Sequence, residues 1–553
     1  MMLAAVDLGY TPQVVLLAYM VLLLGIGFVG YLRGRQTEED YYLAGRGQGV
    51  WATALTIMAT MFSSAAMLGI PGLVYRDGVA FMLFALNLPV AGVAIFVLGS
   101  RIARIGRKRG YVTPADLVAD YYDGSAAVRL LAALVGVLYV IPYIIMQIKA
   151  GGYLAQRLFP DVPPVKLLGL EMDMFSLGVN ALSVITMAYV LIGGMRSVAW
   201  SDMLQGLLLL GGMVLAGVAT IAAMGGFSGY FKAVSALPTE ALSLPGATGA
   251  WTPWKLLTIC MFTSVASMIQ PAQWMRFYSA ASTGTLRKSS LIFSLVLPAC
   301  FLFGVMLVAL GGRALYPPEL IDGQIIPHAS IGSKSAEVDQ VVIVMIQEQI
   351  PILLGASLGA ITISILLVAI MAASMSTADS NLHALSAVLT RDVYDRYVRP
   401  QASERERAWV GKGIIVMTTL FALGLVHLSE GNTGDFNPLA LIAEMMLLAI
   451  AFSCQLLPAT LDVLFVRCGT RAGAVAGMIG GLLVVLSFTP LPGALLPTGG
   501  ADTMNALTIT LKRLFDIGFC GFVVNVSLFA LVSRFTQPIS AERQCEFIKD
   551  LSS

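Results

Sequence analysis

The sequence is short of charged residues and of the side chains that enzymes use for catalysis. Charged residues make up 12% of its 553 positions, against about 25% in a typical soluble protein. It has three histidines and six cysteines, without metal-ligand spacing. No HExxH, GxSxG or phosphate-binding glycine loop is present. These absences argue against a soluble domain, a membrane enzyme and an ATP-driven pump, and a net charge of +2 suggests no nucleic-acid partner.

Long apolar runs fill most of the chain. Hydrophobic residues account for 57% of it, the mean hydropathy is +0.82, and a membrane-spanning helix needs about 20 apolar residues. We therefore predict an all-α polytopic membrane protein with about 13 transmembrane helices, the first retained rather than cleaved as a signal peptide. The predicted spans are 12–32, 51–75, 79–100, 129–156, 176–195, 203–225, 254–275, 290–311, 353–378, 413–429, 437–466, 472–489 and 514–533. The polar segment 107–125 is expected to form a short surface helix.

The second predicted span is unsuited to a plain membrane anchor. Hydroxyl side chains lie at its centre, and a Gly-Ile-Pro-Gly sequence follows at 69–72. Freed backbone groups find no partner in hydrocarbon, so an irregular helix persists there only inside protein or beside a cavity. Transporters use such broken helices to bind ions and solutes near the membrane midplane. The stretch 51–78 therefore predicts half of a binding site.

Lysine and arginine are distributed unevenly between the two sides of the membrane. With the N-terminus outside, nine of the 34 basic residues fall outside, Lys149 lies within a span, and 24 fall on the cytoplasmic side. The positive-inside rule therefore predicts an outer N-terminus and a cytoplasmic C-terminus.

The predicted spans divide into two groups of five. We predict an N-terminal extra helix and loop at 1–48, a first half at 49–226, a second half at 250–467, and two extra helices with a cytoplasmic tail at 468–553. The first span of each half opens with a tryptophan, Trp51 or Trp254. An odd number of spans per half gives the halves opposite orientations, which is an inverted repeat.

Four motifs carry a family resemblance. EDYYLAGRGQGVWATAL with the following Pro71–Gly72 pair, GGMRSVAWSDMLQG at 193–206, QPAQWMR at 270–276 and MAASMSTADSNL at 371–382 resemble signatures of the sodium/solute symporter family. The resemblance runs from Glu39 to Tyr397 and points to bacterial members, with the monocarboxylate and pantothenate carriers as the closest branch. It implies a LeuT-like 5+5 inverted repeat with one extra N-terminal and two extra C-terminal helices. It also implies a secondary transporter in the bacterial cytoplasmic membrane that is not an enzyme and co-transports a sodium ion.

The same resemblance implies a sodium site between the broken helix and the span at 353–378. Its ligands would be the hydroxyls of Ser376 and Thr377 and the carbonyls of Ala373, Ala59 and Phe62. The alternative is that these small and hydroxylated residues only allow helices to pack closely.

Met61 departs from the family pattern. Some members carry an acidic residue at the matching position, just after the first-helix sodium carbonyl, and Met61 supplies no charge. Coupling to protons instead of sodium therefore stays open.

Several charged residues within or near spans have two readings. Asp202 is either a helix N-cap or, by resemblance, a station on the path by which sodium leaves to the cytoplasm. Lys149 either extends its amine to the outer interface or provides a counter-charge for a carboxylate substrate. Asp379, four residues before His383, is expected in a surface or gate pair rather than as an ion ligand. Glu444, inside the span 437–466, is a functional candidate because acids within a membrane are unfavourable.

The predicted solute pocket contains hydroxyls and amides together with Lys149: Ser63, Ser64, Gln147, Thr263, Ser267 and Gln270. Thr263 and Ser267 replace an aromatic pair found in the proline-carrying branch, which disfavours a stacking pocket for proline. We predict sodium-coupled uptake of a monocarboxylate or pantothenate-like acid by alternating access. Sodium- or proton-coupled uptake of an amino acid such as proline and a transporter-like sensor are the alternatives. The expected partners are a small organic solute and the lipid bilayer; a monomer suffices, and the oligomeric state is open.

Overall fold

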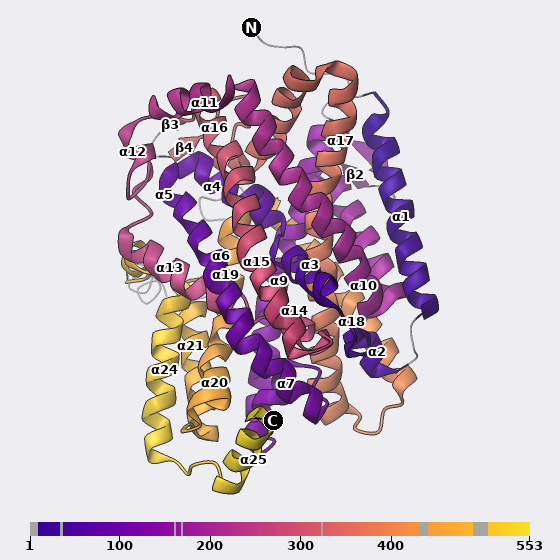
Figure 1. The fold of residues 1–553 in the computed structure, drawn as a ribbon, viewed down its shortest axis with the longest axis vertical. Coiled ribbons are helices and arrows are strands. Elements are labelled where there is room, and N and C mark those ends of the chain that lie inside the picture. Colours follow the sequence, from indigo (N-terminus) through magenta and orange to yellow (C-terminus); the bar gives the residue numbers. More distant parts are fainter. Residues whose placement is uncertain are drawn as a thin grey trace.

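The computed structural model describes residues 9–33, 37–159, 162–167, 170–321, 324–430, 441–489 and 507–552. Nearly all of its regular structure is helical, as the apolar runs predict (Figure 1). The longer helices are α1 (Thr11–Arg33), α3 (Val50–Met61), α7 (Ser100–Arg109), α9 (Ala126–Leu158), α10 (Met174–Ala223), α11 (Gly226–Ser235), α13 (Pro253–Ala266), α15 (Thr283–Phe301), α17 (Val341–Val388), α18 (Glu404–Glu430), α19 (Ile442–Ser453), α21 (Arg471–Ser487), α24 (Ile517–Phe535) and α25 (Ala541–Ser552).

The shorter α-helices connect or extend these. They are α2 (Glu38–Leu43), α4 (Ile70–Asp77), α5 (Val79–Met82), α6 (Asn87–Ala94), α8 (Pro114–Tyr121), α12 (Thr239–Leu242), α14 (Pro271–Ser279), α16 (Leu307–Leu315) and α20 (Leu457–Leu461). The 3₁₀ and π segments are η1 (Ala44–Arg46), η2 (Ala65–Gly69), η3 (Leu83–Leu86), η4 (Ile95–Gly99), η5 (Leu302–Met306), η6 (Ser335–Gln340), η7 (Leu389–Val398), η8 (Cys454–Leu456) and η9 (Asp462–Val466).

Two antiparallel hairpins are the only sheets among the described residues. They pair β1 (Val165–Leu167) with β2 (Leu170–Met172), and β3 (Glu319–Ile321) with β4 (Gln324–Ile326). Each has two three-residue strands, so the hairpins are connections between helices and not a second structural layer.

The number of membrane spans is lower than predicted. Within the described residues, 10 helices are long and apolar enough to cross a membrane, or up to 12 when each of two bent helix pairs is counted as one span. The predicted span 472–489 corresponds to α21, an apolar helix of 17 residues that is shorter than the spanning helices counted above. The count of 13 is therefore not confirmed.

Two long helical elements, α10 and α17, are kinked at a glycine instead of being divided by a loop. The separate spans predicted at 176–195 and 203–225 belong to the single element α10, which is interrupted at Gly194 with φ of +58°. Gly355 interrupts α17 in the same way, with φ of +73°. Glycine lacks a Cβ and adopts these left-handed conformations readily, so the chain changes direction there without an intervening loop.

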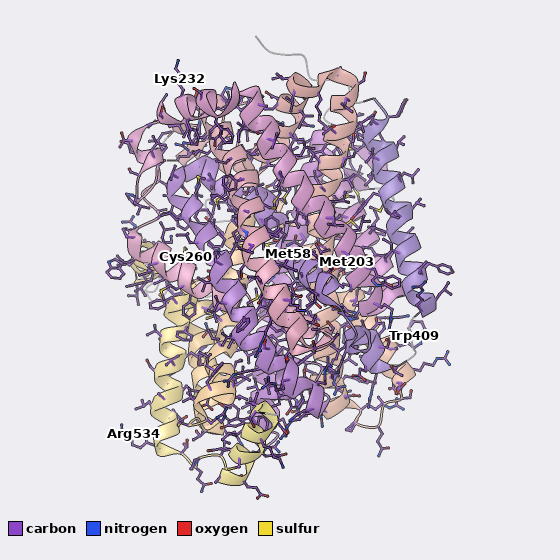
Figure 2. The ribbon with its side chains drawn as sticks, viewed as in Figure 1. Met58, Met203, Lys232, Cys260, Trp409 and Arg534 are labelled. Carbon is purple, nitrogen blue, oxygen red and sulfur yellow. The ribbon has the colours of Figure 1, made fainter. Side chains whose placement is uncertain are left out.

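The first spans of both predicted halves are broken in the middle. The axes of α3 and the η2–α4 segment differ by 59°, and those of α13 and α14 differ by 45°. The sequence predicted the first of these breaks but not the second. Met58, just before the first break, lies about midway along the molecule, whereas Lys232 lies at one end and Arg534 near the other (Figure 2).

The other helices surround these two broken spans. α10 packs along α17 and α9, α1 lies against α10 at one side, and α21 pairs with α24 at the opposite side (Figure 1). Ser197 of α10 donates a hydrogen bond to the Gly27 carbonyl of α1 (3.1 Å). The C-terminal helix α25 lies against α7 at one end of the molecule.

The expected surface helix in 107–125 forms, but it is buried. α8 begins at a capping box made by Thr113 and Asp116, and most of its side chains are inaccessible to solvent. Arg129 of α9 donates to Asp116 (2.9 Å) and to Asp392 of η7 (2.5 Å). Burial alone would raise the pKa of Asp116, but Arg391, Arg129 and the N–H of Val112 together lower it below its ordinary value. This buried charge network fixes α8 against α9 and η7.

The glycine at the end of η2 allows the broken span to pack closely on α19. A Cβ added at Gly69 would lie 2.6 Å from the backbone nitrogen of Ala443, whereas one added at Gly25 of α1 would meet nothing within 4 Å. We predict that Gly69→Ala destabilises the protein by about 1–3 kcal/mol through overpacking and that Gly25→Ala does not. Thermal unfolding of the purified variants in detergent tests this, and equal melting temperatures for the two would contradict it.

Candidate functional site

The site is built around the interruption of the second span. α3 ends at Met61, and its last backbone hydrogen bond runs from the Phe62 N–H to the Met58 carbonyl (2.8 Å). Phe62 has φ of −87° and ψ of +89°, outside the helical region. The carbonyls just before the break therefore lose their usual helical partners and need others.

Hydroxyl groups of α17 reach one of these carbonyls. Ser376 Oγ donates to the Ala59 carbonyl oxygen (3.0 Å), and Thr377 Oγ1 lies 3.3 Å from the same oxygen. Ser376 Oγ also contacts the Ala373 carbonyl (3.1 Å), and Thr377 Oγ1 the Thr60 carbonyl (3.4 Å). Four of the five predicted sodium ligands thus lie together, all of them fully buried.

Phe62, the fifth predicted ligand, occupies the break itself. In a continuous helix the N–H groups of Ala65 or Ala66 would bond its carbonyl, but they donate to the side-chain and backbone oxygens of Ser63 (3.2 and 2.9 Å). The Phe62 ring packs edge-on against Phe301, with ring centroids 5.4 Å apart. The ring is therefore anchored in the core while the carbonyl belongs to the irregular backbone.

An amide from α9 holds the far side of the break. The Ser64 N–H donates to Gln147 Oε1 (2.9 Å), and Ser64 Oγ donates to the Met146 carbonyl (3.0 Å). Ser63, Ser64 and Gln147, three predicted pocket residues, are each 0% exposed. The structure therefore groups them at the break.

The second broken span meets the first. Gln270, at the start of α14, donates from Nε2 to the sulfur of Met61 (3.7 Å), while its Oε1 is buried without a partner among the described residues. Gln273 Nε2 reaches the Ile57 carbonyl (3.4 Å). The predicted pocket residues Thr263 and Ser267 are buried near the end of α13. Gln270 therefore presents an unused amide oxygen beside Met61, at the edge of the first break.

Lys149 does not extend its amine to the interface. Its side chain is 2% exposed, so the snorkelling interpretation is wrong. Residues two apart on a helix do not share a face, so Lys149 points away from Gln147. It is close enough to the buried Asp339 for their charges to interact. Asp339 in turn accepts the Ile442 N–H (3.1 Å) and lies against Gly72.

Asp202 is not a helix cap, because it lies inside α10, eight residues after the Gly194 kink. Its carboxylate forms an ion pair with Arg276 of α14, with Nη2 and Oδ2 separated by 2.8 Å and both side chains 0% exposed. Thr56 of α3 donates its hydroxyl to the same carboxylate and accepts from Arg276 Nε (3.0 Å). Asp202 Oδ1 has no partner among the described residues.

A hydroxyl chain joins this ion pair to the Ser376–Thr377 pair. Ser380, one turn further along α17, donates to the Ser376 carbonyl (2.6 Å) and accepts from Arg276. Thr60 Oγ1 lies 3.4 Å from Ser380 Oγ. Hydroxyl groups therefore connect the break to the Arg276–Asp202 pair.

The interpretation of Asp379 as a surface residue is wrong. It is 0% exposed, accepts a hydrogen bond from the Tyr189 hydroxyl (2.8 Å), and has its Oδ1 3.0 Å from Ser380 Oγ. His383 packs instead against the rings of Tyr41 and Tyr42, with centroids 5.2 and 5.4 Å away.

Glu444 lies within the apolar span Ile442–Val466, as predicted, but it is not buried inside the protein. Its side chain is 52% exposed, lies in the first turn of α19 and pairs with Arg76 at 3.8 Å. An acid in the first turn is favoured by the helix dipole. Residues 437–440, where the predicted span begins, lie outside the described residues.

Sequence reasoning did not single out Arg276, which the fold pairs with Asp202, or Asp339, which lies near Lys149. Arg276 is the last residue of the QPAQWMR motif, and Asp339 lies between the predicted spans 290–311 and 353–378. Their burial was the missing signal, and it depends on contacts with residues far away in the chain. Among the described residues, no group of three or more His, Cys, Asp or Glu side chains is placed to hold a metal ion. The site at the break is thus made of neutral oxygens.

Comparison with known proteins shows the family and the fold of the chain. A model of the sodium:solute symporter family matches residues 41–481. The sodium/proline symporters of Escherichia coli (strain K12) and Staphylococcus aureus (strain JH9) are each 26% identical to the chain. The alignments cover 86% of this chain and 87% of the first relative, and 87% of this chain and 86% of the second.

Two solved structures share the fold. A substrate-bound, outward-open Na⁺-coupled sialic acid symporter superposes with a TM-score of 0.71 at 19% identity, covering 97% of this chain and all of that one. Mhp1, a nucleobase-cation-symport-1 family transporter in a closed conformation, gives 0.51 at 12% identity, covering 93% of this chain and all of that one. The expected LeuT-like fold is confirmed.

The buried Arg276–Asp202 pair generates a stability prediction. Arg276→Gln or Asp202→Asn alone leaves an uncompensated buried charge, and we expect each to destabilise the protein by about 3–5 kcal/mol. The double variant removes both charges, so its loss is expected to be smaller than the sum of the two. Thermal unfolding of the four proteins in one detergent measures this coupling. Additive effects would show that the two side chains do not form a pair.

Proposed function

The chain belongs to the sodium:solute symporter family, and on that premise we propose where its sodium ion binds and what it carries. It is a sodium-coupled secondary transporter of a small organic solute, a multi-pass membrane protein and not an enzyme. Sodium is the co-transported ion. The observation that carries the proposal is the convergence of Ser376 and Thr377 on the Ala59 carbonyl at the break.

We assign sodium to the space between this carbonyl and the two hydroxyls. Hard cations are bound by oxygen ligands, and a monovalent ion needs no carboxylate among them. The carbonyls of Ala373 and Phe62 complete the proposed set. The hydroxyls now donate to carbonyls, and an ion entering between them would turn each hydroxyl's lone pair inward. Met61 supplies no charge, so these neutral oxygens act alone.

Asp202 is proposed as the exit station for the ion. It is the carboxylate at the end of the hydroxyl chain through Ser380 and Thr60, and one of its oxygens is unpartnered among the described residues. Arg276 neutralises it at rest. A sodium ion passing towards the cytoplasm would then compete with Arg276 for Asp202.

The proposed transport cycle uses the two halves 49–226 and 250–467 as inverted repeats. Each half begins with a broken span, and the two breaks meet through Gln270 and Met61. Binding of sodium and solute at this junction would hold both breaks in one geometry and close the outer path. With the N-terminus outside and the C-terminus cytoplasmic, as the basic residues indicate, the membrane potential drives sodium inward, contributing about 2.3 kcal/mol per charge per 100 mV.

For the solute, we propose a small carboxylic acid of the monocarboxylate or pantothenate type. Lys149 is a buried cation on the helix that also supplies Gln147 to the break. It would attract the carboxylate, sharing its charge with Asp339. The hydroxyls and amides of Ser63, Ser64, Gln147, Thr263, Ser267 and Gln270 would orient the remainder.

An amino acid is the second candidate. The relatives from Escherichia coli and Staphylococcus aureus are sodium/proline symporters, and an amino acid also carries a carboxylate. The test compares the carboxylic acid with the amino acid as solute. It measures uptake into proteoliposomes under an inward sodium gradient, with ¹⁴C-labelled pyruvate, propionate, pantothenate and proline. Saturable, sodium-dependent uptake of proline alone would favour the second candidate.

Ser376 provides the test of the sodium site. We predict that Ser376→Ala raises the sodium concentration for half-maximal uptake by about tenfold or more, because one of two hydroxyl ligands is lost. Ser374→Ala is the matched control: Ser374 is equally buried on α17, but among the described residues its hydroxyl bonds only the Ile370 carbonyl of its own helix (3.3 Å). Equal sodium dependence of the two variants would contradict the assignment.

Variants of Lys149 test whether this residue attracts the carboxylate of the solute. We predict that Lys149→Gln raises the KM for the acid about tenfold or more with little change in sodium affinity, because the attractive charge is removed. Lys149→Arg keeps the charge and is expected to retain a KM closer to that of the wild type. Uptake kinetics at saturating sodium measure both. An unchanged KM in Lys149→Gln would remove Lys149 from the solute site without affecting the sodium assignment.

A further inference from the structure

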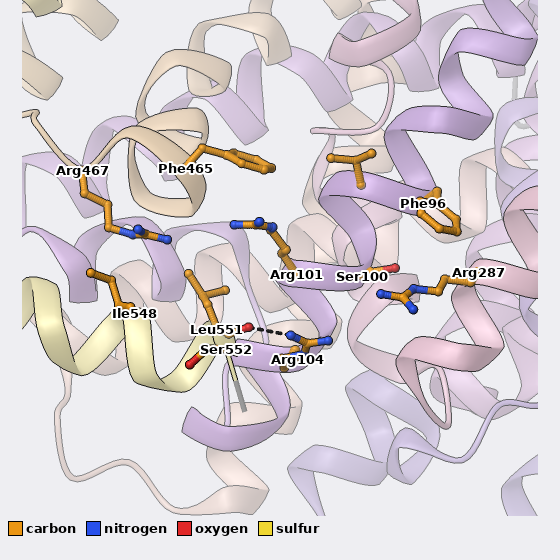
Figure 3. Close-up of a pocket in the computed structure, with 11 residues that line it drawn as sticks. Phe96, Ser100, Arg101, Arg104, Arg287, Phe465, Arg467, Ile548, Leu551 and Ser552 are labelled. Atoms are coloured by element: carbon orange, nitrogen blue, oxygen red, sulfur yellow. Dashed lines mark hydrogen bonds between the residues drawn. The ribbon is translucent and has the colours of Figure 1, made fainter.

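Four arginines line a pocket far from the proposed transport site. The pocket has a volume of about 400 Å³ and lies where α7, the start of α15, the end of η9 and the C-terminal helix α25 meet (Figure 3). Arg101 and Arg104 come from α7, Arg287 from α15, and Arg467 from the residue after η9. No acidic residue is among its lining residues. The pocket is therefore strongly positive.

Three of the four arginines are held in place by backbone carbonyls and not by carboxylates. Arg101 donates to the Leu464 carbonyl (2.7 Å), Arg104 to the Leu551 carbonyl (2.5 Å) and Arg467 to the Leu464 carbonyl (3.2 Å). In the part of the chain that the structure describes, none of the four has an ion pair, and Arg467 Nε is buried without a partner. Arg101 is close enough to Arg467 and Arg104 for their charges to repel. An anion in the pocket would relieve this repulsion.

The rim of the pocket is apolar and open to the outside. Phe96 is 46% exposed, Val97 41% and Ile548 43%. The guanidinium of Arg101 lies 4.3 Å from the centroid of the Phe465 ring, and that of Arg287 lies 5.3 Å from the Phe96 ring. Arg101 and Phe465 lie near the ends of the apolar spans Val79–Arg109 and Ile442–Val466. Cations at the ends of two spans, beside exposed apolar side chains, match the depth at which lipid headgroups meet hydrocarbon.

We propose that this pocket binds the phosphate of an anionic glycerophospholipid. The planar guanidinium suits phosphate oxygens because it presents paired N–H donors, and the acyl chains would lie over Phe96, Val97 and Phe465. The apolar rim favours a lipid over a free phosphate ion, which would gain nothing from those side chains. The bound headgroup would connect α7, α15, the end of η9 and α25. The proposal is independent of the transported solute and of the sodium site.

Two variants test the site, each against a matched control. Arg287→Gln removes an exposed cation of the pocket, and Lys288→Gln removes the neighbouring exposed cation that does not line it. Arg101→Gln with Arg467→Gln removes two partly buried cations, and Arg534→Gln is an exposed control at the same end of the molecule (Figure 2). Native mass spectrometry counts the lipids retained by full-length protein. Thermal unfolding measures stabilisation by added phosphatidylglycerol, phosphatidylcholine or inorganic phosphate.

The expected result is that phosphatidylglycerol is retained and stabilises the wild type and both controls. Its apparent affinity should fall about threefold or more in Arg287→Gln and tenfold or more in the double variant. Phosphatidylcholine, and inorganic phosphate at millimolar concentration, should have little effect. Equal retention by Arg287→Gln and Lys288→Gln would overturn the proposal even if the double variant fails to fold. Stabilisation by inorganic phosphate equal to that by phosphatidylglycerol would overturn the assignment to a lipid.

Discussion

The structure depends on how backbone polar groups are satisfied at one break in the middle of a membrane span. Hydrocarbon provides no hydrogen-bond partners, so interrupting α3 at Phe62 obliges neighbouring elements to supply them. Ser376 and Thr377 of α17 bind the freed Ala59 carbonyl, and Gln147 of α9 binds the Ser64 N–H on the other side. The same hydroxyls that make the break possible are suited to hold a cation. In the proposed site, stability of the fold and binding of sodium would therefore rest on one set of oxygens.

The buried charges are arranged around this break and connect it to other elements. The Arg276–Asp202 pair joins α14 to α10, with Thr56 of α3 bound to both. Removing two charges from water is unfavourable, so such a pair is better explained by a need for those groups than by stability alone. It lies at the end of the hydroxyl chain that begins at Ser376, which is why we propose it for ion release. The pocket lined by Arg101, Arg104, Arg287 and Arg467 is the opposite case, because no carboxylate lines it to balance the four positive charges.

Predictions for single residues were correct where neighbouring residues in the sequence set the structure, and they were wrong where contacts with distant residues set it. The break near Phe62 was predictable, because Gly69, Pro71 and the buried hydroxyls stand close together in the sequence. The burial of Asp379 and the exposure of Glu444 were not, because each depends on a partner, Tyr189 or Arg76, that lies about 190 or 370 positions away along the chain. The burial of Lys149 is a similar case. Its position in an apolar run left two orientations open, and the packing of α9 selected the inward one.

The sequence by itself determined that the chain is a helical membrane protein with an interrupted second span, since apolar length and helix-breaking residues act locally. The family motifs also placed the hydroxyl pair of α17 near that interruption. Only the tertiary structure decided which charges face each other, where α10 and α17 kink without a loop, and that four arginines from separate elements line one pocket. Those features depend on rotations and depths of helices, and these are set by packing between residues far apart in sequence.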